Sequence, residues 1–207
     1  MALDKKTRKM QDLIKHQKEI SKKVFEKLKI VCPFVKLAGG APRDWYLGEP
    51  CNDLDFYFCT MASQIVYTRF QLESIFPEAS ITLLMDRQGG KSDPLYESMK
   101  NLIRIWEMVV DGVPVQLIQM KSIADVSNVE EQMDVSICKI SYDPVYDEYH
   151  KHSDFKITDK SKIIFLKEGY SLNCPHAQKI KRRFVDEWRY RLGTKDFAIN
   201  CVLRRLE

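Results

Sequence analysis

The sequence predicts an α+β fold, and three patterns support that prediction. Residues 4–30 contain neither Pro nor Gly and repeat apolar residues at the spacing of an amphipathic helix. These apolar residues lie along one side of the expected helix: Met10, Leu13, Ile20, Val24 and Leu28. Within 101–120, two apolar runs flank Asp111-Gly112, a dipeptide favoured in hairpin turns. The last third of the chain is mostly helical in pattern, and helices together with an antiparallel hairpin indicate the α+β class.

Local signals place the elements between the first helix and the hairpin. Pro33 ends the helix, and 34–38 is expected to form a short buried strand that runs into a glycine turn. Residues 41–48 suit one or two helical turns with Gly48 as the stop. The alternating, aromatic stretch 53–59 predicts a strand. Three further elements are expected before the hairpin: a helix over 61–76, a strand over 80–85 and a loop over 86–100.

The second half of the chain is expected to be helical with one irregular stretch. In order, we expect a helix over 122–133, a compact element over 134–143, an irregular stretch to about residue 160, and then helices. In the last part, Ile180, Phe184 and Trp188 mark an inward face opposite Lys181, Arg182 and Arg183. These elements predict three regions: an N-terminal helix over 1–30, a central domain over 31–145 and a mostly helical extension over 146–207.

The composition excludes several classes of protein. The chain has 207 residues, of which 44% are hydrophobic, enough to bury a core without disulfides. Its six cysteines form no CxxC pair, no apolar leader follows Met1, and no apolar run approaches the roughly 18 residues of a membrane helix. We therefore expect a cytoplasmic protein with reduced thiols and no membrane partner. The net charge of +4 gathers in 1–30 and 179–205, which indicates either nucleic-acid contacts or solvated helix faces.

Two aspartates stand one residue apart at the start of the expected strand 53–59. Side chains at i and i+2 of a strand point to the same face, so Asp53 and Asp55 bring two negative charges together. Bound Mg²⁺ removes the repulsion, because it takes oxygen ligands from one or two carboxylates and from substrate phosphates. Two ions roughly 3.5–4 Å apart clamp the attacking and leaving oxygens of a phosphoryl transfer. A solvated surface pair is the plain alternative.

A glycine turn and a cation precede these aspartates. Gly39 and Gly40 lack Cβ atoms, so the backbone can approach a phosphate closely, and the N–H groups of the following helix favour anions. Arg43 adds a planar cation suited to phosphate oxygens, while Asp44 is expected to support the turn or to pair with a neighbour. Each feature is common alone. Their order of strand, glycine turn, short helix and strand makes the combination specific.

In this order and spacing the sequence resembles the nucleotidyltransferase superfamily, and in particular the head domain of CCA-adding tRNA nucleotidyltransferases and bacterial poly(A) polymerases. The residues that match the motif of that head domain are Gly39, Gly40, Arg43, Asp44, Gly48, Asp53 and Asp55. The resemblance covers about residues 34–143. It implies a polymerase β-like head with a mixed sheet, and the short "GGAPRDW" form is similar to compact proteins that phage genomes encode.

Two other segments depart from the family pattern. "QMDVSIC" is similar to the family motif Arg-Arg-Asp-Phe-Thr-Ile-Asn, which makes Asp134 a candidate third acid, but Gln132 and Met133 stand where that motif has arginines. The wider superfamily carries a third carboxylate on a central strand, where this chain has Gln116. Glu107, on the other strand of the expected hairpin, is the nearby alternative. An amide can ligate a metal but cannot act as a general base.

The resemblance implies transfer of a nucleoside monophosphate from an NTP to an acceptor hydroxyl, with an RNA or tRNA 3′ end as the expected acceptor. Asp53, Asp55 and Asp134 are the implied catalytic acids, the first two holding Mg²⁺ or Mn²⁺. The implied nucleotide-binding residues are Gly39, Gly40 and Arg43. Two alternatives stay open: nucleotidylation of a protein or small molecule, as in toxin-like members, and a catalytically impaired relative that binds nucleotide or RNA.

Other residues with functional potential have plainer explanations. His150 and His152 are spaced as metal ligands can be, but exposed loop histidines are the more common case. Tyr142, Tyr146 and Tyr149 can stack on a nucleobase or pack against helices, with packing favoured. Cysteines 32, 59 and 138 have apolar neighbours and are expected to be core thiols.

Overall fold

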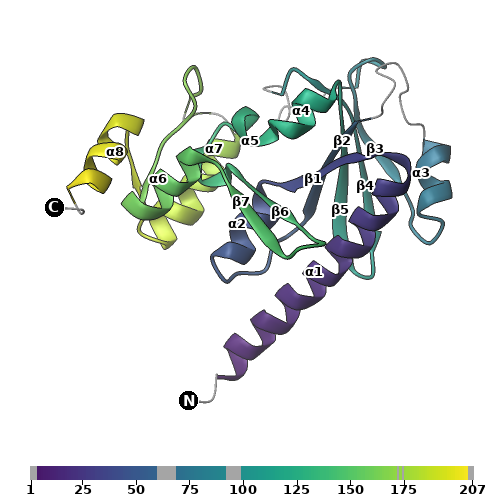
Figure 1. Ribbon diagram of the computed structural model, residues 1–207, viewed down its shortest axis with the longest axis horizontal. Helices are drawn as coiled ribbons and strands as arrows, with labels where there is room; N and C mark the ends of the chain where they lie inside the picture. Colours follow the sequence, from purple (N-terminus) through teal and green to yellow (C-terminus); the bar gives the residue numbers. More distant parts are fainter. Residues whose placement is uncertain (1–3, 60–68, 92–98, 172, 174, 205–207) are drawn as a thin grey trace. The chain divides into compact units, whose positions relative to one another are not determined.

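The computed structural model describes residues 4–59, 69–91, 99–171, 173 and 175–204, and the chain divides into two compact units (Figure 1). The first unit comprises Met1–Val129 and Ser141–His150, and the second comprises Glu130–Ile140 and Lys151–Glu207. No helix among the described residues is both long and apolar enough to cross a membrane.

The first unit is built on a seven-stranded mixed sheet. Its elements in chain order are α1 (Lys5–Val31), β1 (Phe34–Ala38), α2 (Gly40–Tyr46), β2 (Leu54–Cys59), α3 (Arg69–Ile75), β3 (Thr82–Asp86), β4 (Leu102–Val110), β5 (Val113–Met120), α4 (Ile123–Ser127), β6 (Ile140–Asp143) and β7 (Glu148–Lys151). The strand order is β3-β4-β5-β2-β1-β6-β7. β2 and β5 run parallel, whereas β1 is antiparallel to β2 and β6, and β4 is antiparallel to β3 and β5. The predicted α+β class with a mixed sheet and helical additions is confirmed.

Helix α1 begins and ends where its sequence signals place it. The Asp4 side chain accepts hydrogen bonds from the backbone N–H groups of Lys6 and Thr7, which caps the first turn. The helix ends at Val31, two residues before Pro33. Its buried face consists of Gln17, Ile20, Ser21, Val24, Phe25 and Leu28. The prediction for Leu13 is wrong: its side chain is exposed, because the first turns of α1 extend beyond the strands (Figure 1).

The β4–β5 hairpin is confirmed at Asp111-Gly112. Both residues have positive φ, 48° and 82°, as a type I′ turn requires. The turn is also tied to α1, because Lys23 Nζ lies 3.0 Å from Asp111 Oδ2 and His16 Nε2 lies 3.1 Å from the Asp111 carbonyl oxygen. Trp106 on β4 is a fully buried core residue. Cys32, Cys59 and Cys138 are buried free thiols, as expected.

Several other expectations are confirmed only in part. The predicted helix over 61–76 is confirmed from Arg69 as α3, and residues 60–68 and 92–98 lie outside the described part of the chain. The predicted helix over 122–133 divides at Asn128 into α4 and α5 (Val129–Gln132). The expectation of an irregular stretch up to about residue 160 is wrong, because this part of the chain contains β7 and helix α6 (Ser153–Ser161). Helix α6 buries polar side chains, so it shows little of the apolar periodicity on which the prediction relied.

The second unit consists mainly of short helices. Besides α5 and α6 it contains η2 (Ser136–Cys138), β8 (Ile163–Ile164), α7 (Pro175–Ile180), a π-helical turn η3 (Lys181–Glu187), β9 (Arg191–Leu192) and α8 (Lys195–Leu203). β8 and β9 pair in parallel. The predicted inward face is confirmed at Ile180 and Phe184, which are buried, while Trp188 is half-buried against Phe184 with ring centroids 5.5 Å apart.

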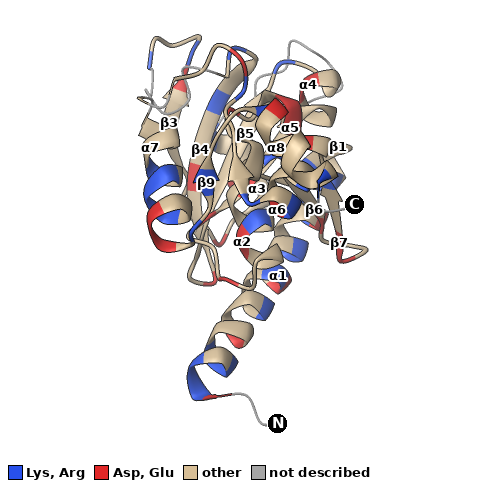
Figure 2. Ribbon diagram, turned by 90° about the vertical axis from the view of Figure 1, so that its left-hand side faces the viewer, with Lys and Arg blue, Asp and Glu red and all other residues tan. Residues whose placement is uncertain are grey.

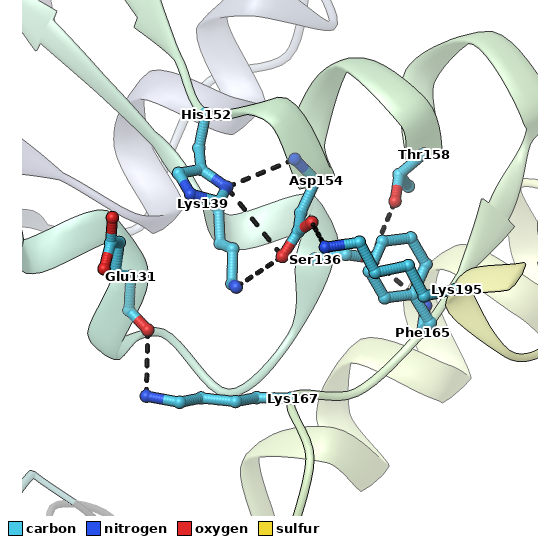
Figure 3. Close-up of polar contacts among 9 residues, drawn as sticks. All are labelled: Glu131, Ser136, Lys139, His152, Asp154, Thr158, Phe165, Lys167 and Lys195. Carbon is cyan, nitrogen blue, oxygen red and sulfur yellow. Dashed lines mark hydrogen bonds and ion pairs between the residues drawn. The ribbon is translucent and has the colours of Figure 1, made fainter. Parts of the chain in front are cut away.

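A buried polar network joins the helices of the second unit (Figure 3). The carboxylate of Asp154 lies 2.6 Å from Lys139 Nζ and 2.8 Å from Lys195 Nζ, and both Asp154 and Lys139 have side chains only 7% exposed. The hydroxyl of Ser136 accepts hydrogen bonds from the Thr158 hydroxyl and from the backbone N–H of Phe165. These contacts connect η2, α6, α8 and the segment after β8, so charge and hydrogen bonding contribute much of what orders this unit.

Candidate active site

The two aspartates lie at the beginning of β2, near the centre of the sheet. Asp53 directly precedes the strand and Asp55 is its second residue, and both are half-buried. The intervening Leu54 and the following Phe56 are fully buried in the core that also holds α1 and α2. Since side chains alternate along a strand, Asp55 lies on the face opposite to that core, and Asp53 directly precedes the strand. One carboxylate oxygen of Asp55, Oδ1, is shielded from solvent.

A row of polar side chains crosses the neighbouring strands from Asp55. Gln116 on β5 is the register partner of Asp55, and Glu107 on β4 is the register partner of Gln116. Register partners on adjacent strands project to the same face, with about 4.8 Å between strands, so the Cα of Glu107 lies about 10 Å from that of Asp55. The structure therefore places an amide beside the acid pair, and a carboxylate one strand further along the same face.

The glycine turn lies at the same end of the sheet as the aspartates. β1 and β2 are antiparallel with Leu37 opposite Phe56, so the turn that ends β1 adjoins the start of β2. Gly39 has φ 87° and ψ −120°, a conformation that is strained for any residue with a Cβ. Gly40 begins α2, and the N-cap residue is Gly39, which has no side chain that could cap the helix. Local backbone geometry thus requires glycine at the position where the family motif has one.

Arg43 and Asp44 form a buried ion pair beside this turn. Arg43 Nε donates to Asp44 Oδ1 at 2.7 Å, and the two side chains are 7% and 3% exposed. Nη2 of Arg43 lies 3.8 Å from where a Cβ on Gly40 would stand, so the guanidinium rests against the glycine turn. The expectation that Asp44 pairs with a neighbour is confirmed. The arginine is held in one orientation by a carboxylate that balances its charge.

The thiol of Cys51 lies in the connection between α2 and β2. Burial, and then the carboxylates of Asp44, Asp53 and Asp55, raise the pKa of the Cys51 thiol far above its usual value. Cys51 is therefore a neutral, unreactive thiol.

Asp134 lies in the second unit and is engaged by a histidine. Its Oδ1 is 2.7 Å from Nδ1 of His176, the second residue of α7, and the Asp134 side chain is 10% exposed. Burial alone would lower the pKa of His176, but hydrogen bonds to Asp134 and to the Cys138 thiol raise it to about 10. The imidazole is therefore protonated at neutral pH. No motif in the sequence marks His176, which lies 42 residues from Asp134.

This ion pair predicts a pH dependence of stability. The folded-state pKa of His176, about 10, exceeds its unfolded value near 6.5. The stabilisation is therefore complete below pH 6.5, declines as pH rises because the unfolded state binds fewer protons, and is absent above about pH 10. We expect His176→Gln to lower the urea midpoint clearly at pH 6 and little at pH 10. An equal loss at both pH values would show that the pair contributes no charge-dependent stability.

The remaining candidates from the sequence are structural. The Nδ1 atom of His152 accepts the backbone N–H of Asp154 and caps α6. Within the described residues, no group of three or more His, Cys, Asp or Glu side chains is arranged to hold a metal ion. Tyr142 is buried between Trp45 and Tyr149, with ring centroids 5.3 and 5.1 Å away. Packing, rather than base stacking, is thus the role of Tyr142, whereas Tyr146 is exposed.

Comparison with known proteins identifies the fold by structure and not by sequence. No protein-family profile and no curated protein matches the sequence. A tRNA-processing enzyme in an apo form matches 98% of this chain and 48% of its own, with a TM-score of 0.56 and 13% identity. A CCA-adding enzyme in complex with ATP matches 83% of this chain and 37% of its own (TM-score 0.52, 12% identity). The Thermotoga maritima CCA-adding enzyme complexed with tRNA matches 82% of this chain and 38% of its own length (TM-score 0.51, 15% identity).

The chain spans less than half the length of these three proteins. At 12–15% identity the likeness concerns the fold alone, and it agrees with the mixed sheet. The chain therefore has the nucleotidyltransferase-like fold of the CCA-adding enzymes, with helical additions to the sheet.

Proposed function

We propose that this protein is a nucleotidyltransferase that transfers a nucleoside monophosphate from an NTP to an acceptor hydroxyl, with an RNA or tRNA 3′ end as acceptor. One observation carries the proposal: Asp53 and Asp55 stand at the start of β2, at the end of the sheet where the Gly39 turn and Arg43 lie, within a nucleotidyltransferase-like fold. In this reaction the acceptor oxygen bonds to the α-phosphorus, the bond to the β-phosphate oxygen breaks, and pyrophosphate leaves. The proton of the hydroxyl passes to a base or to water.

The residues at the head of β2 fit a hard divalent cation. Asp53 and Asp55 offer carboxylate oxygens, Gln116 offers an amide oxygen beside them, and these are the ligand types that Mg²⁺ or Mn²⁺ prefers. Two protein carboxylates are a usual number for Mg²⁺ that also binds substrate phosphates. Such ions would supply charge neutralisation at the phosphates. The protein itself would hold the carboxylates in place and orient the triphosphate through the Gly39–Gly40 backbone and the Arg43 guanidinium.

The third acid remains a proposal with two candidates. Asp134 is the candidate from the family motif, but its carboxylate is bound to His176. Glu107 lies on the same sheet face as Asp55, across Gln116, and is half-buried. We favour Glu107 as the group that completes the site, because the sheet register fixes its position relative to Asp55.

Exposed basic residues support an RNA acceptor. On the first turns of α1 they are Lys5, Lys6, Arg8 and Lys9, and in the second unit they include Lys179, Lys181 and Arg182 (Figure 2). Such runs bind phosphate backbones through charge, with an affinity that falls steeply as salt rises. The solved CCA-adding enzymes include complexes with CTP, ATP and tRNA, which are the kinds of nucleotide and RNA partner proposed for this chain.

A second candidate function is nucleotide or RNA binding without turnover. Gln116 favours it, since an amide stands beside the two aspartates where a third carboxylate would strengthen metal binding. A protein or small-molecule acceptor is a further outcome that one experiment distinguishes from the RNA acceptor.

The experiment offers each α-labelled NTP with Mg²⁺ and bulk tRNA to the wild type and to the Asp53→Ala/Asp55→Ala double variant. We expect label in RNA with the wild type only. Label in protein would identify a protein acceptor. No incorporation above the double variant, together with Mg²⁺-dependent NTP binding, would identify a non-catalytic relative. Neither incorporation nor binding would contradict the proposed function.

A further inference from the structure

A buried glutamine on α1 contacts both segments that carry the candidate site. Gln17 is 5% exposed and lies on the otherwise largely apolar inner face of the helix. Its Nε2 donates to the carbonyl of Cys51 at 2.7 Å, and its Oε1 accepts from the backbone N–H of Cys51 and from the indole N–H of Trp45, both at 3.0 Å. One side chain thus makes three buried hydrogen bonds to residues 28 and 34 positions away.

The chemistry of these contacts requires an amide. Indole and backbone N–H groups only donate and a carbonyl only accepts, so the orientation of the Gln17 amide is determined by its partners. Cys51 lies in the connection between α2 and β2, outside the sheet ladder, and Gln17 satisfies both of its backbone polar groups. A carboxylate could not donate to the carbonyl, and an apolar side chain would leave buried polar groups without these bonds.

The two partners stand next to the site residues in sequence. Trp45 follows Arg43 by two positions on α2, and Cys51 precedes Asp53 by two positions. Trp45 is itself buried and packs edge-on against Tyr142. The backbone of Cys51, which Gln17 binds through both its N–H and its carbonyl, therefore lies directly before the acid pair in the chain. Gln17 therefore connects the helix that follows the glycine turn to the segment that leads into the aspartates.

We propose that Gln17 is a positioning residue, which sets the placement of Asp53 and Asp55 relative to the glycine turn and Arg43. This inference rests on the proposed function, since positioning matters only if the two segments bind one metal–nucleotide complex. Misplacing binding groups by about 1 Å can cost about 10²-fold in rate, so a helix outside the motif contributes to the geometry of the site.

The test compares two α1 variants that both remove buried contacts. Gln17→Met keeps the volume of the side chain but removes the three hydrogen bonds. Val24→Ala opens space on the same buried face, about two helical turns further along α1, and removes no hydrogen bond of the side chain. We expect both to lower the melting temperature. Only Gln17→Met should weaken Mn²⁺ binding, by about tenfold, as measured by the electron paramagnetic resonance of free Mn²⁺. Only this variant should also lower kcat more than it raises KM.

A milder variant keeps the inference testable if Gln17→Met folds poorly. Trp45→Phe removes one hydrogen bond and leaves both contacts of Gln17 with Cys51, so we expect it to weaken Mn²⁺ binding by about threefold. If Gln17→Met and Trp45→Phe bind Mn²⁺ with the same affinity as Val24→Ala, the positioning role is overturned while the proposed function is left intact. A wild type that binds neither Mn²⁺ nor NTP would overturn both.

Discussion

In the proposed reaction, replacing Asp55 by Asn is expected to lower the rate of nucleotidyl transfer by at least about 10³-fold, because it removes a proposed metal-ligating carboxylate and each 1.36 kcal/mol is tenfold. Asn keeps the size and one oxygen of the side chain but removes its charge, so the fold is retained. Asp55 has one oxygen shielded from solvent and lies beside Gln116, which cannot replace the lost charge. Single-turnover rates with saturating labelled NTP measure the effect.

Three companion variants complete this measurement. Glu148→Gln neutralises an exposed carboxylate at the start of β7 in the same sheet and should leave the rate unchanged. Glu107→Gln should lower the rate by about 10²-fold if Glu107 is the third acid, whereas Gln116→Glu should tighten metal binding by adding a carboxylate next to Asp55. A rate for Asp55→Asn within tenfold of the wild type would contradict the metal-binding role of Asp55.

Replacing Asp154 by Ala is expected to destabilise the second unit by about 3–5 kcal/mol, since it leaves the buried ammonium of Lys139 without its counter-ion. Burial acts to raise the pKa of Asp154, but Lys139 and Lys195 lower it below its ordinary value. The stabilisation is therefore present above pH 3.8 and is lost as pH falls through the lower folded-state pKa. Equilibrium unfolding in urea at pH 7 measures the loss.

The double variant Asp154→Leu/Lys139→Met provides the control for this prediction. It removes both charges of the buried pair and fills the space with apolar groups, so its stability should return close to that of the wild type. Lys195→Met removes only the more exposed partner, whose side chain is 52% exposed, and should cost less than about 1 kcal/mol. Equal losses in Asp154→Ala and the double variant would show that the cavity, rather than the unpaired charge, dominates.

Elements whose signals are local can be predicted from this sequence. The α1 helix, the hairpin turn at Asp111-Gly112 and strand β2 follow from periodicity and turn chemistry, and the structure confirms each. Elements whose stabilising contacts are distant cannot be predicted in this way. Helix α6 is ordered by Asp154 and Thr158, which bind residues 15 and 22 positions earlier, so its own sequence carries little apolar signal.

The candidate site shows the same division. Gly39, Arg43, Asp53 and Asp55 were recognisable because the motif lies within seventeen consecutive residues. Gln17 and His176 were not recognisable from the sequence, since each acts through partners that are far away in the chain. The register that places Gln116 and Glu107 on the face of Asp55 is likewise a property of strand pairing, not of any short stretch.

By itself, the sequence determined helix α1, the β4–β5 hairpin, strand β2 and the short segment that carries the acids, because backbone preferences and side-chain alternation act over a few residues. Tertiary structure alone decided which groups surround those acids and how charges are paired, from Gln17 at Cys51 to Asp134 at His176. Burial makes such pairings energetically decisive, and burial depends on segments that meet only when the chain folds.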